Sequence, residues 1–271
     1  MRNGFTIVQR MHPARIAELL QPFLDSAADQ PLTPGDLLRI STYIDLLQRW
    51  NARINLTAIR DPEQIVTRHF GESLFAARHL FPMRLERLEP VPESEDRVRP
   101  EDVVENDRGR AALQGRDRAP KHAGALAPVP RERLSLADVG SGAGFPGIPI
   151  KLWAPHLSLT LIESNQKKAI FLREVVRALT LTDVNIQTAR AETLPARSFN
   201  VVTLRAVERF ATILPAAAQL VRPAGRLALL IGATQQDQAH QTLPGLLWSD
   251  PLPIPTSRNR ILLIARVPSG T

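Results

Sequence analysis

The sequence predicts an α/β fold with a doubly wound, mostly parallel sheet and an N-terminal helical extension. From residue 134 onward, short apolar runs alternate with stretches of helical periodicity, as strands and helices do in such a sheet. Residues 1–83 show helical periodicity without these runs, and residues 84–133 show neither pattern. We therefore expect an extension over 1–83 that packs on the catalytic domain, an insertion over 84–133 and a sheet domain over 134–271.

Residues 1–83 are expected to form helices. Thr33-Pro34-Gly35-Asp36 is typical of a helix start, with a capping side chain, proline at the first helical position and an acid in the first turn. Another helix is expected to open at Asp61-Pro62 and to carry Arg68, His69 and Glu72. On a helix face, an arginine and a histidine are more often surface or packing residues than catalysts.

Residues 84–133 contain six prolines, no aromatic residue and eleven basic against eleven acidic side chains. Such a stretch buries too little apolar surface to offset the entropy lost on ordering. We expect it to be a disordered insertion.

The sheet domain is expected to alternate strands and helices. Its first strand contains Leu134, Leu136 and Val139 as buried residues, and Ile170 belongs to the apolar side of its main helix. The carboxyl ends of parallel strands hold the ligands in such sheets, so the site is expected there. The predicted strands cover 136–139, 157–162, 184–188, 200–204 and 226–231, with an edge hairpin around Pro253 and 260–267; the predicted helices are a short one after the first strand, 166–178 and 211–221.

The first strand runs into a glycine-rich loop with Gly140, Gly142, Gly144 and Gly147. Glycine permits positive φ and close approach of a ligand, so the loop is predicted to bind a nucleoside cofactor. Two cofactor classes fit. The dinucleotide pattern G-x-G-x-x-G matches, with Glu163 placed for a ribose hydroxyl. The S-adenosylmethionine pattern, which begins at an acid two residues before the first glycine, also matches, and two prolines in the following turn favour it over a pyrophosphate site.

Composition excludes several classes of function. The chain has no cysteine, and its six histidines show no metal-ligand spacing, so we expect no metal site. It has neither a run of eighteen apolar residues nor a secretory signal, so we expect a cytoplasmic protein without membrane contact. The net charge is +7, and residues 134–271 carry a surplus of six basic side chains, which suits a nucleic-acid partner.

Several separate motifs resemble the glucose-inhibited division protein B family, the bacterial small-subunit (16S) rRNA guanine-N7 methyltransferases. The resemblance covers both flanks of the insertion, and Gly-Phe-Pro-Gly-Ile-Pro is more specific than the glycine loop itself. The motifs are Trp50-Asn51-x-x-Ile54-Asn55-Leu56-Thr57-x-x-Arg60-Asp61-Pro62, Arg68-His69-Phe70-x-Glu72-Ser73-Leu74, Asp138 to Pro149, Lys167-Lys168-x-x-Phe171-Leu172 and Arg205-Ala206.

The resemblance implies a class I, Rossmann-like, S-adenosylmethionine-dependent methyltransferase that acts in rRNA processing on small-subunit rRNA or the ribosomal subunit. It further implies that Gly140, Phe145, Ala191-Glu192 and Arg205 contact the cofactor. The chain departs from the family in the long insertion, in Glu72 instead of aspartate, and in Ile231 instead of a lysine before glycine. Arg226 is the residue we consider as a compensating cation.

The site residues are assigned roles as follows. Gly140, Gly142 and Gly144 admit the amino-acid end of the cofactor, Glu163 accepts from the ribose, and Ala191-Glu192 meets the adenine. Arg205 binds the cofactor carboxylate or an RNA phosphate, or else forms a structural ion pair. Phe145 stacks on cofactor or base, or else packs in the core. The candidates for substrate binding are Arg68, His69 and Arg205.

The chemistry follows from residues that are absent. An exocyclic amine typically needs an Asn/Asp-Pro-Pro-aromatic loop after the fourth strand, where this chain has Leu204-Arg205-Ala206-Val207, and C5 of a pyrimidine needs a cysteine. Guanine N7 presents a lone pair with no proton to remove, so no catalytic base is nominated. Two alternatives stay open, namely an NAD(P)-dependent oxidoreductase and a non-enzymatic rRNA- or ribosome-binding protein. We expect a monomer.

Overall fold

The computed structural model describes residues 10–24, 32–82, 133–205 and 210–269 of the 271-residue chain. The predicted insertion, apart from residue 133, lies outside the described residues. Its disorder and the division of the chain into three parts stay predictions.

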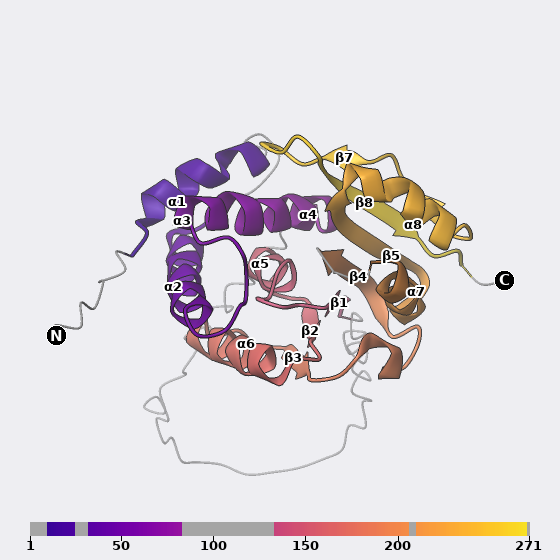
Figure 1. The fold of residues 1–271 in the computed structure, drawn as a ribbon, viewed down its shortest axis with the longest axis horizontal. Helices are drawn as coiled ribbons and strands as arrows, with labels where there is room; N and C mark the ends of the chain where they lie inside the picture. The colour runs from indigo at the N-terminus through magenta and orange to yellow at the C-terminus, as the bar shows by residue number, and fades with distance from the viewer. Residues whose placement is uncertain (1–9, 25–31, 83–132, 206–209, 270–271) are drawn as a thin grey trace, which may run out of the picture. The chain divides into compact units, whose positions relative to one another are not determined.

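The described residues build an eight-stranded sheet with the order β3-β2-β1-β4-β5-β8-β6, in which β7 also pairs with β8 (Figure 1). Strands β1 to β5 are mutually parallel, and β8 runs antiparallel to β5. The predicted fold class is therefore confirmed. The strands are β1 (Ser135–Val139), β2 (Ser158–Ile162), β3 (Val184–Gln187), β4 (Phe199–Arg205), β5 (Val221–Gly232), β6 (Leu247–Trp248), β7 (Leu252–Pro253) and β8 (Arg260–Arg266).

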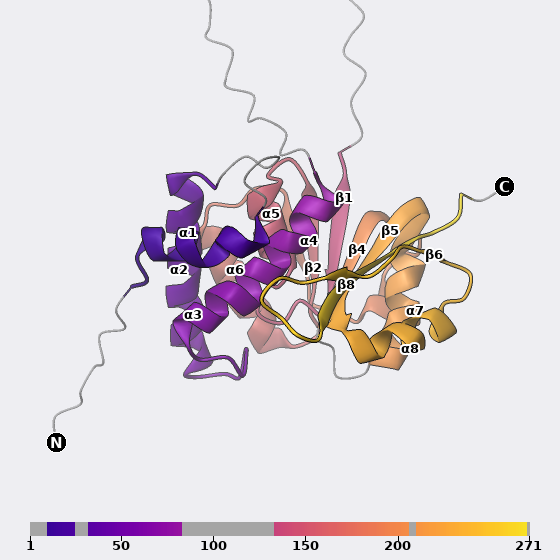
Figure 2. The same cartoon turned by 90° about the horizontal axis from the view of Figure 1, so that it is seen from above.

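Helices cover both faces of this sheet, and each face has its own hydrophobic core (Figure 2). Alternate residues of one strand serve different cores, as Leu136 and Ala137 of β1 show. One core joins α1, α2, α4, α5 and α6 to the sheet, and the other joins α7 and α8. The helical segments are α1 (Pro13–Leu20), η1 (Gln21–Phe23), α2 (Pro34–Asn51), α3 (Pro62–Gln64), η2 (Ile65–Gly71), α4 (Glu72–Leu80), α5 (Gly147–Trp153), α6 (Gln166–Ala178), η3 (Ala191–Thr193), α7 (Phe210–Leu220), η4 (Ala233–Gln235) and α8 (Gln236–Thr242).

The predicted helix starts are present. Thr33 caps α2 in a reciprocal arrangement: its hydroxyl accepts from the Asp36 amide, and the Asp36 carboxylate accepts from the Thr33 amide. Asp61 caps the next helix by accepting from the Gln64 amide at 2.8 Å. The sequence predicts one regular helix here, whereas in the structure residues 65–71 form a π-helix between α3 and α4. Such segments are rare and occur often at functional sites.

Two expectations about the sheet domain are wrong. Leu134 is 39% exposed and precedes β1, and Ile170 is 45% exposed on α6. Leu134 lies one residue before the sheet begins, and α6 buries a narrower stripe than its apolar positions suggest. The predicted C-terminal hairpin is confirmed, since β7 pairs with β8 at the end of the sheet beyond β5, where β6 also pairs with β8. The two-residue strand β6 is too short to show a sequence pattern.

Candidate functional site

The glycine loop follows β1 at the point where the strand order reverses, between β1 and β4. Gly140, Gly142 and Gly144 have φ values of 67°, 57° and 87°, as predicted for positions that require glycine. Asp138 anchors the loop from below. Its Oδ2 accepts from the Gly147 amide at 3.2 Å, and its Oδ1 accepts from the Thr203 hydroxyl at 2.9 Å. Burial raises the pKa of this carboxyl to about 7.

Glu163, at the end of β2, supports the loop from the other side. Its Oε2 accepts from the Gly142 amide at 2.8 Å and its Oε1 from the Asn165 amide at 2.7 Å. Each carboxylate oxygen can accept a second hydrogen bond. The side chain therefore fixes the loop and keeps acceptor capacity for a ligand.

A cavity of about 290 Å³ lies above these strand ends. It brings together four of the predicted site residues, Gly140, Glu163, Ala191 and Glu192. The rest of its lining was not predicted. Two of the lining residues, Thr212 and Ile213, belong to α7, and the position of this helix directly after β4 is the sequence signal that could have indicated them. These additional residues are Val139, Ile162, Ser164, Ala189, Arg190, Thr212 and Ile213.

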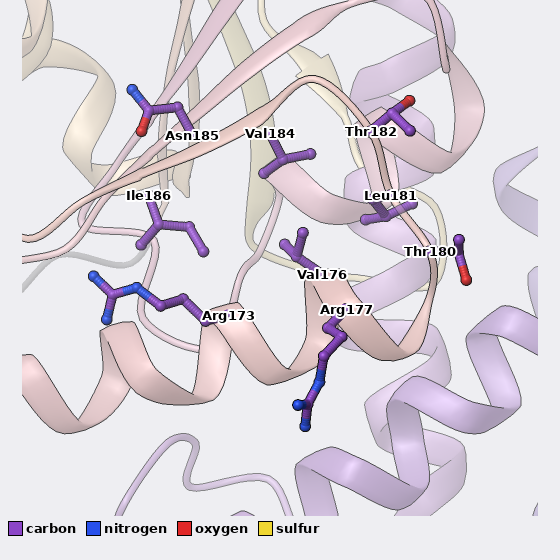
Figure 3. Close-up of a pocket in the computed structure, with 9 residues that line it drawn as sticks. All are labelled: Arg173, Val176, Arg177, Thr180, Leu181, Thr182, Val184, Asn185 and Ile186. Carbon is purple, nitrogen blue, oxygen red and sulfur yellow. The ribbon is translucent and has the colours of Figure 1, made fainter.

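A larger cavity of about 570 Å³ lies between α6 and β3 (Figure 3). Arg173 and Arg177 extend from α6 at its border, and Val184 and Ile186 of β3 face it. None of the predicted site residues lines it. Because ligands of doubly wound sheets bind at the carboxyl ends of the strands, the smaller cavity is the candidate for the cofactor site, and we refer to it as the cofactor cavity.

Phe145 packs inside the protein. Its ring is stacked on Tyr43 of α2 at 5.2 Å and 5°, and on His69 at 4.7 Å and 17°. Two rings from other segments are therefore stacked on it. These contacts and the burial of Phe145 favour the alternative of core packing, while a contact of Phe145 with cofactor or base stays a prediction.

Gly144 also packs against α2. A Cβ on this glycine would lie 2.4 Å from the Tyr43 hydroxyl oxygen and 2.6 Å from Cδ1 of Ile148. The Tyr43 hydroxyl donates to the carbonyl of Ala143. The N-terminal helix α2 is thereby bound directly to the glycine loop.

His69 is held as a neutral ring. Arg205 has only donors, so its Nη1 donates to His69 Nδ1 at 2.9 Å, and His69 Nε2 donates to the Thr57 hydroxyl at 2.8 Å. Burial, together with Arg205, Arg68 and Arg260, lowers the pKa of His69 to about 2. The packing interpretation of His69 fits this geometry.

Arg205 forms the structural ion pair that was its alternative role. Its Nη2 lies 3.1 Å from Oε2 of Glu72 and also donates to the Arg68 carbonyl at 2.6 Å. Arg205 does not line the cofactor cavity, and neither do Gly142, Gly144 or Phe145. The structure thus separates the predicted site residues into a cavity group and a group beneath or beside it.

Arg226 is not the compensating cation. It lies in the part of β5 that pairs with Val201, toward the amino end of β4, and its Nη2 donates to the Leu80 carbonyl at 2.7 Å. At the other end of β5, Ile231 is buried, and Gly232 pairs with Arg260 of β8. The basic side chain at that edge is Arg260, which no sequence motif indicated.

Comparison with known proteins identifies the family. Residues 37–86 and 124–247 match the family model GidB, described as rRNA small subunit methyltransferase G. The chain belongs to the GidB family. A protein called ribosomal RNA small subunit methyltransferase G from Stenotrophomonas maltophilia (strain K279a) is 34% identical over 228 residues, which is 83% of this chain and 82% of that protein.

Another GidB relative with the same name, from Halorhodospira halophila (strain DSM 244 / SL1), is 34% identical over 84% of this chain and 87% of its own length. Among solved structures, a SAM dependent methyltransferase from Aquifex aeolicus is similar over 49% of this chain and 82% of its own, with 15% identity and a TM-score of 0.43.

Membership in the GidB family confirms the predicted enzyme class. This chain is a methyltransferase of small-subunit rRNA. The oxidoreductase and the non-enzymatic alternatives are not favoured. None of the helices in the described ranges is both long and apolar enough to cross a membrane.

Proposed function

We propose that this GidB protein methylates N7 of a guanine in small-subunit rRNA, and that the cavity beside the glycine loop holds its cofactor. The observation that carries the proposal is the meeting of Gly140, Glu163, Ala191 and Glu192 around one cavity at the reversal of strand order. These residues come from three separate turns, after β1, β2 and β3.

The chemistry of the lining fits a nucleoside with an amino-acid arm. Glu163 has unused acceptor positions for ribose hydroxyls, since each oxygen receives one backbone amide. Ala191, Ile162 and Ile213 provide apolar surface for an adenine. Gly140, at positive φ, lets the arm approach the backbone. When bound, S-adenosylmethionine supplies a methyl group attached to a sulfonium.

The protein's contribution to the reaction is positioning. Guanine N7 is a lone-pair acceptor, so its attack on a methyl group leaves no proton to be removed. Asp138 and Glu163 fix the loop, and through it the donor end of the cavity, in one geometry. A rigid arrangement of the two reactants and exclusion of water account for the acceleration. We assign no general base.

The partner is rRNA as naked chain or within the small subunit, and we propose that a single copy of this protein acts on it in the cytoplasm. The basic surplus of residues 134–271 supports contact with a polyanion. A guanine stacked in an A-form helix hides N7 in a groove too narrow for side chains. The target is therefore an unpaired or flipped guanine.

The first test is ligand-induced stabilisation. At one hundred times its Kd, S-adenosylhomocysteine should raise the free energy of unfolding by about 2.7 kcal/mol, because it binds the native state only. NADH at equal concentration serves as the control and should leave the melting temperature unchanged. Stabilisation by NADH alone would overturn the cofactor assignment.

Analysis of the methylated rRNA identifies the atom that accepts the methyl group. Small-subunit rRNA methylated by the protein should be cleaved at one position by the chemistry specific for N7-methylguanosine. A methyl group on an exocyclic amine or a ribose hydroxyl would show that the argument from absent motifs is wrong.

A further inference from the structure

Three arginines share one buried carboxylate. Oε1 of Glu72 lies 3.2 Å from Nε of Arg68, and its Oε2 lies 3.1 Å from Nη2 of Arg205 and 3.0 Å from Nη2 of Arg260. Glu72 is 1% exposed, whereas the arginine side chains are 47%, 9% and 18% exposed in the same order. We call these four residues the arginine cluster.

The charge of the arginine cluster is not balanced. Glu72 is the only acid paired with any of the three arginines in the part of the chain that the structure describes. His69, which touches Arg205, is neutral and adds no charge. Three guanidinium groups against one carboxylate give these four side chains a formal net charge of +2, and two of the guanidinium groups, those of Arg205 and Arg260, are largely buried. Uncompensated buried charge is costly, so the cluster favours a further anion.

The cluster also holds unused hydrogen-bond donors. Nε of Arg205 and Nε of Arg260 are buried and have no partner among the described residues. The Nη2 atoms of the same two arginines do have backbone partners. Arg205 donates to the Arg68 carbonyl, and Arg260 donates to the Leu230 carbonyl. A buried N–H without an acceptor is rare in native proteins and costs free energy. Charge and donors together favour an anionic oxygen as a further partner of the cluster.

The place of the cluster selects the anion. Arg205 ends β4, and Arg260 pairs with Gly232 at the end of β5, so both lie at the carboxyl edge where the reaction occurs. None of the three arginines lines the cofactor cavity, whose charged residues are Glu163, Glu192 and Arg190. A ligand confined to that cavity therefore meets other side chains, whereas an RNA backbone passing along the edge meets the cluster.

We propose that the arginine cluster binds a backbone phosphate of the rRNA next to the target guanine, with Arg68 and Arg260 as the contacting side chains and Arg205 as the buried anchor. This inference rests on the proposed function. Guanidinium groups match phosphate oxygens in geometry and remain charged at any working pH. Phosphate contacts fix the register of a nucleic acid without reading its bases. In the free enzyme Glu72 keeps the guanidinium groups in place, which reduces the ordering cost of RNA binding.

The test compares Arg→Gln variants in the cluster, each of which removes one positive charge, with an Arg→Gln variant at the opposite edge of the sheet. In Arg260→Gln, the KM for in-vitro transcribed small-subunit rRNA should rise about tenfold, and the slope of log KM against log salt should fall by about one. Arg68→Gln should change both in the same direction. Arg68 is half-exposed, so this variant is expected to fold. Arg197→Gln is the matched control, since Arg197 is exposed just before the amino end of β4.

The S-adenosylhomocysteine Kd is measured in every variant and should stay unchanged. A weaker Kd with an unchanged RNA KM would mean that the anion is the cofactor's carboxylate, and would overturn the proposal. A lower melting temperature with unchanged RNA KM and salt slope would show a merely structural cluster and would overturn it too. Failure of the proposed function would be distinguishable from this. The wild-type protein would then methylate an atom other than guanine N7, while the RNA KM would still change in the cluster variants.

Discussion

At the scale of single residues, His69 is a side chain whose protonation the fold controls strongly. Its ring is covered by Phe145 on one face, and both nitrogens are engaged, by Arg205 and Thr57. Three arginines and burial oppose a positive charge on the ring. The unfolded chain has no such restraint, so the two states bind different numbers of protons in mild acid.

We predict that this difference makes the protein sensitive to acid. The pKa of His69 is about 2 when folded, against an ordinary value of 6.5. The lowered pKa contributes stability that is fully present above pH 6.5 and is lost as the pH falls below it. The loss amounts to about 1.4 kcal/mol per pH unit. His69→Gln, which can still accept from Arg205, should remove this part of the slope.

Urea unfolding of both proteins between pH 4.5 and 7.5 measures that slope. Nitrogen NMR of the ring provides an independent readout, which should show the Nε2-protonated neutral tautomer throughout this range. An imidazolium signal near pH 5 in the folded protein would contradict the prediction.

Residue-level roles were the least predictable from the sequence. The φ values of the glycines follow from residue type alone and were predicted, as was the position of Glu163 at a strand end. Phe145 and Arg205 could not be assigned, because their partners Tyr43 and Glu72 are more than a hundred residues away in the chain. A motif shows which residue types belong together, but not which neighbours cover them.

At the scale of elements, the contact between α2 and the glycine loop depends on a single glycine. Gly144 approaches the Tyr43 hydroxyl so closely that no side chain fits, and its φ of 87° disfavours any other residue. We predict that Gly144→Ala lowers the free energy of unfolding by about 2 to 4 kcal/mol. Denaturant unfolding measures this loss.

Two further variants separate the causes. Gly245→Ala is the control, because nothing lies within 4 Å of its added Cβ, and its effect should stay within about 0.5 kcal/mol. Tyr43→Phe in the Gly144→Ala background removes the clashing hydroxyl and should cost less than the two single changes combined. A stable Gly144→Ala protein with weakened S-adenosylhomocysteine binding would show instead that Gly144 faces the ligand.

The elements themselves were predictable where periodicity is strong. The helix over 166–178 has the predicted bounds, because Asn165 caps it and its apolar stripe is regular. The π-helix over 65–71 has no such signature, since the extra residue in the turn is set by packing. It is this turn that places Arg68, His69 and Glu72 beside β4.

At the scale of the whole molecule, segments before and after the insertion share one core. The Phe81 carbonyl at the end of α4 accepts from Nε1 of Trp153 at 3.1 Å, and the Leu80 carbonyl accepts from Arg226. Residues from α2, α4, α5 and α6 lie in the same hydrophobic cluster. The arginine cluster likewise joins residues up to 188 positions apart, which explains why no local pattern indicated it.

We predict that residues 84–133 can be replaced by a Gly/Ser linker of about twelve residues without loss of the fold. The linker is about one quarter as long as the segment that it replaces. The entropic cost of closing the loop is therefore smaller, which should stabilise the protein by about 1 kcal/mol. The urea midpoint should rise slightly, the transition should stay cooperative, and S-adenosylhomocysteine should bind as before. A destabilisation of several kcal/mol would show that these residues belong to the core.

The stacked pair of Tyr43 and Phe145 also gives the protein an internal reporter. Tyr43 is the only tyrosine of the chain, and its hydroxyl donates to the carbonyl of Ala143 inside the glycine loop. Protein expressed with fluorotyrosine in place of tyrosine would therefore give a single fluorine NMR signal, from a ring in contact with that loop. Movement of the loop would be visible at one resonance, in full-length protein and without mutation.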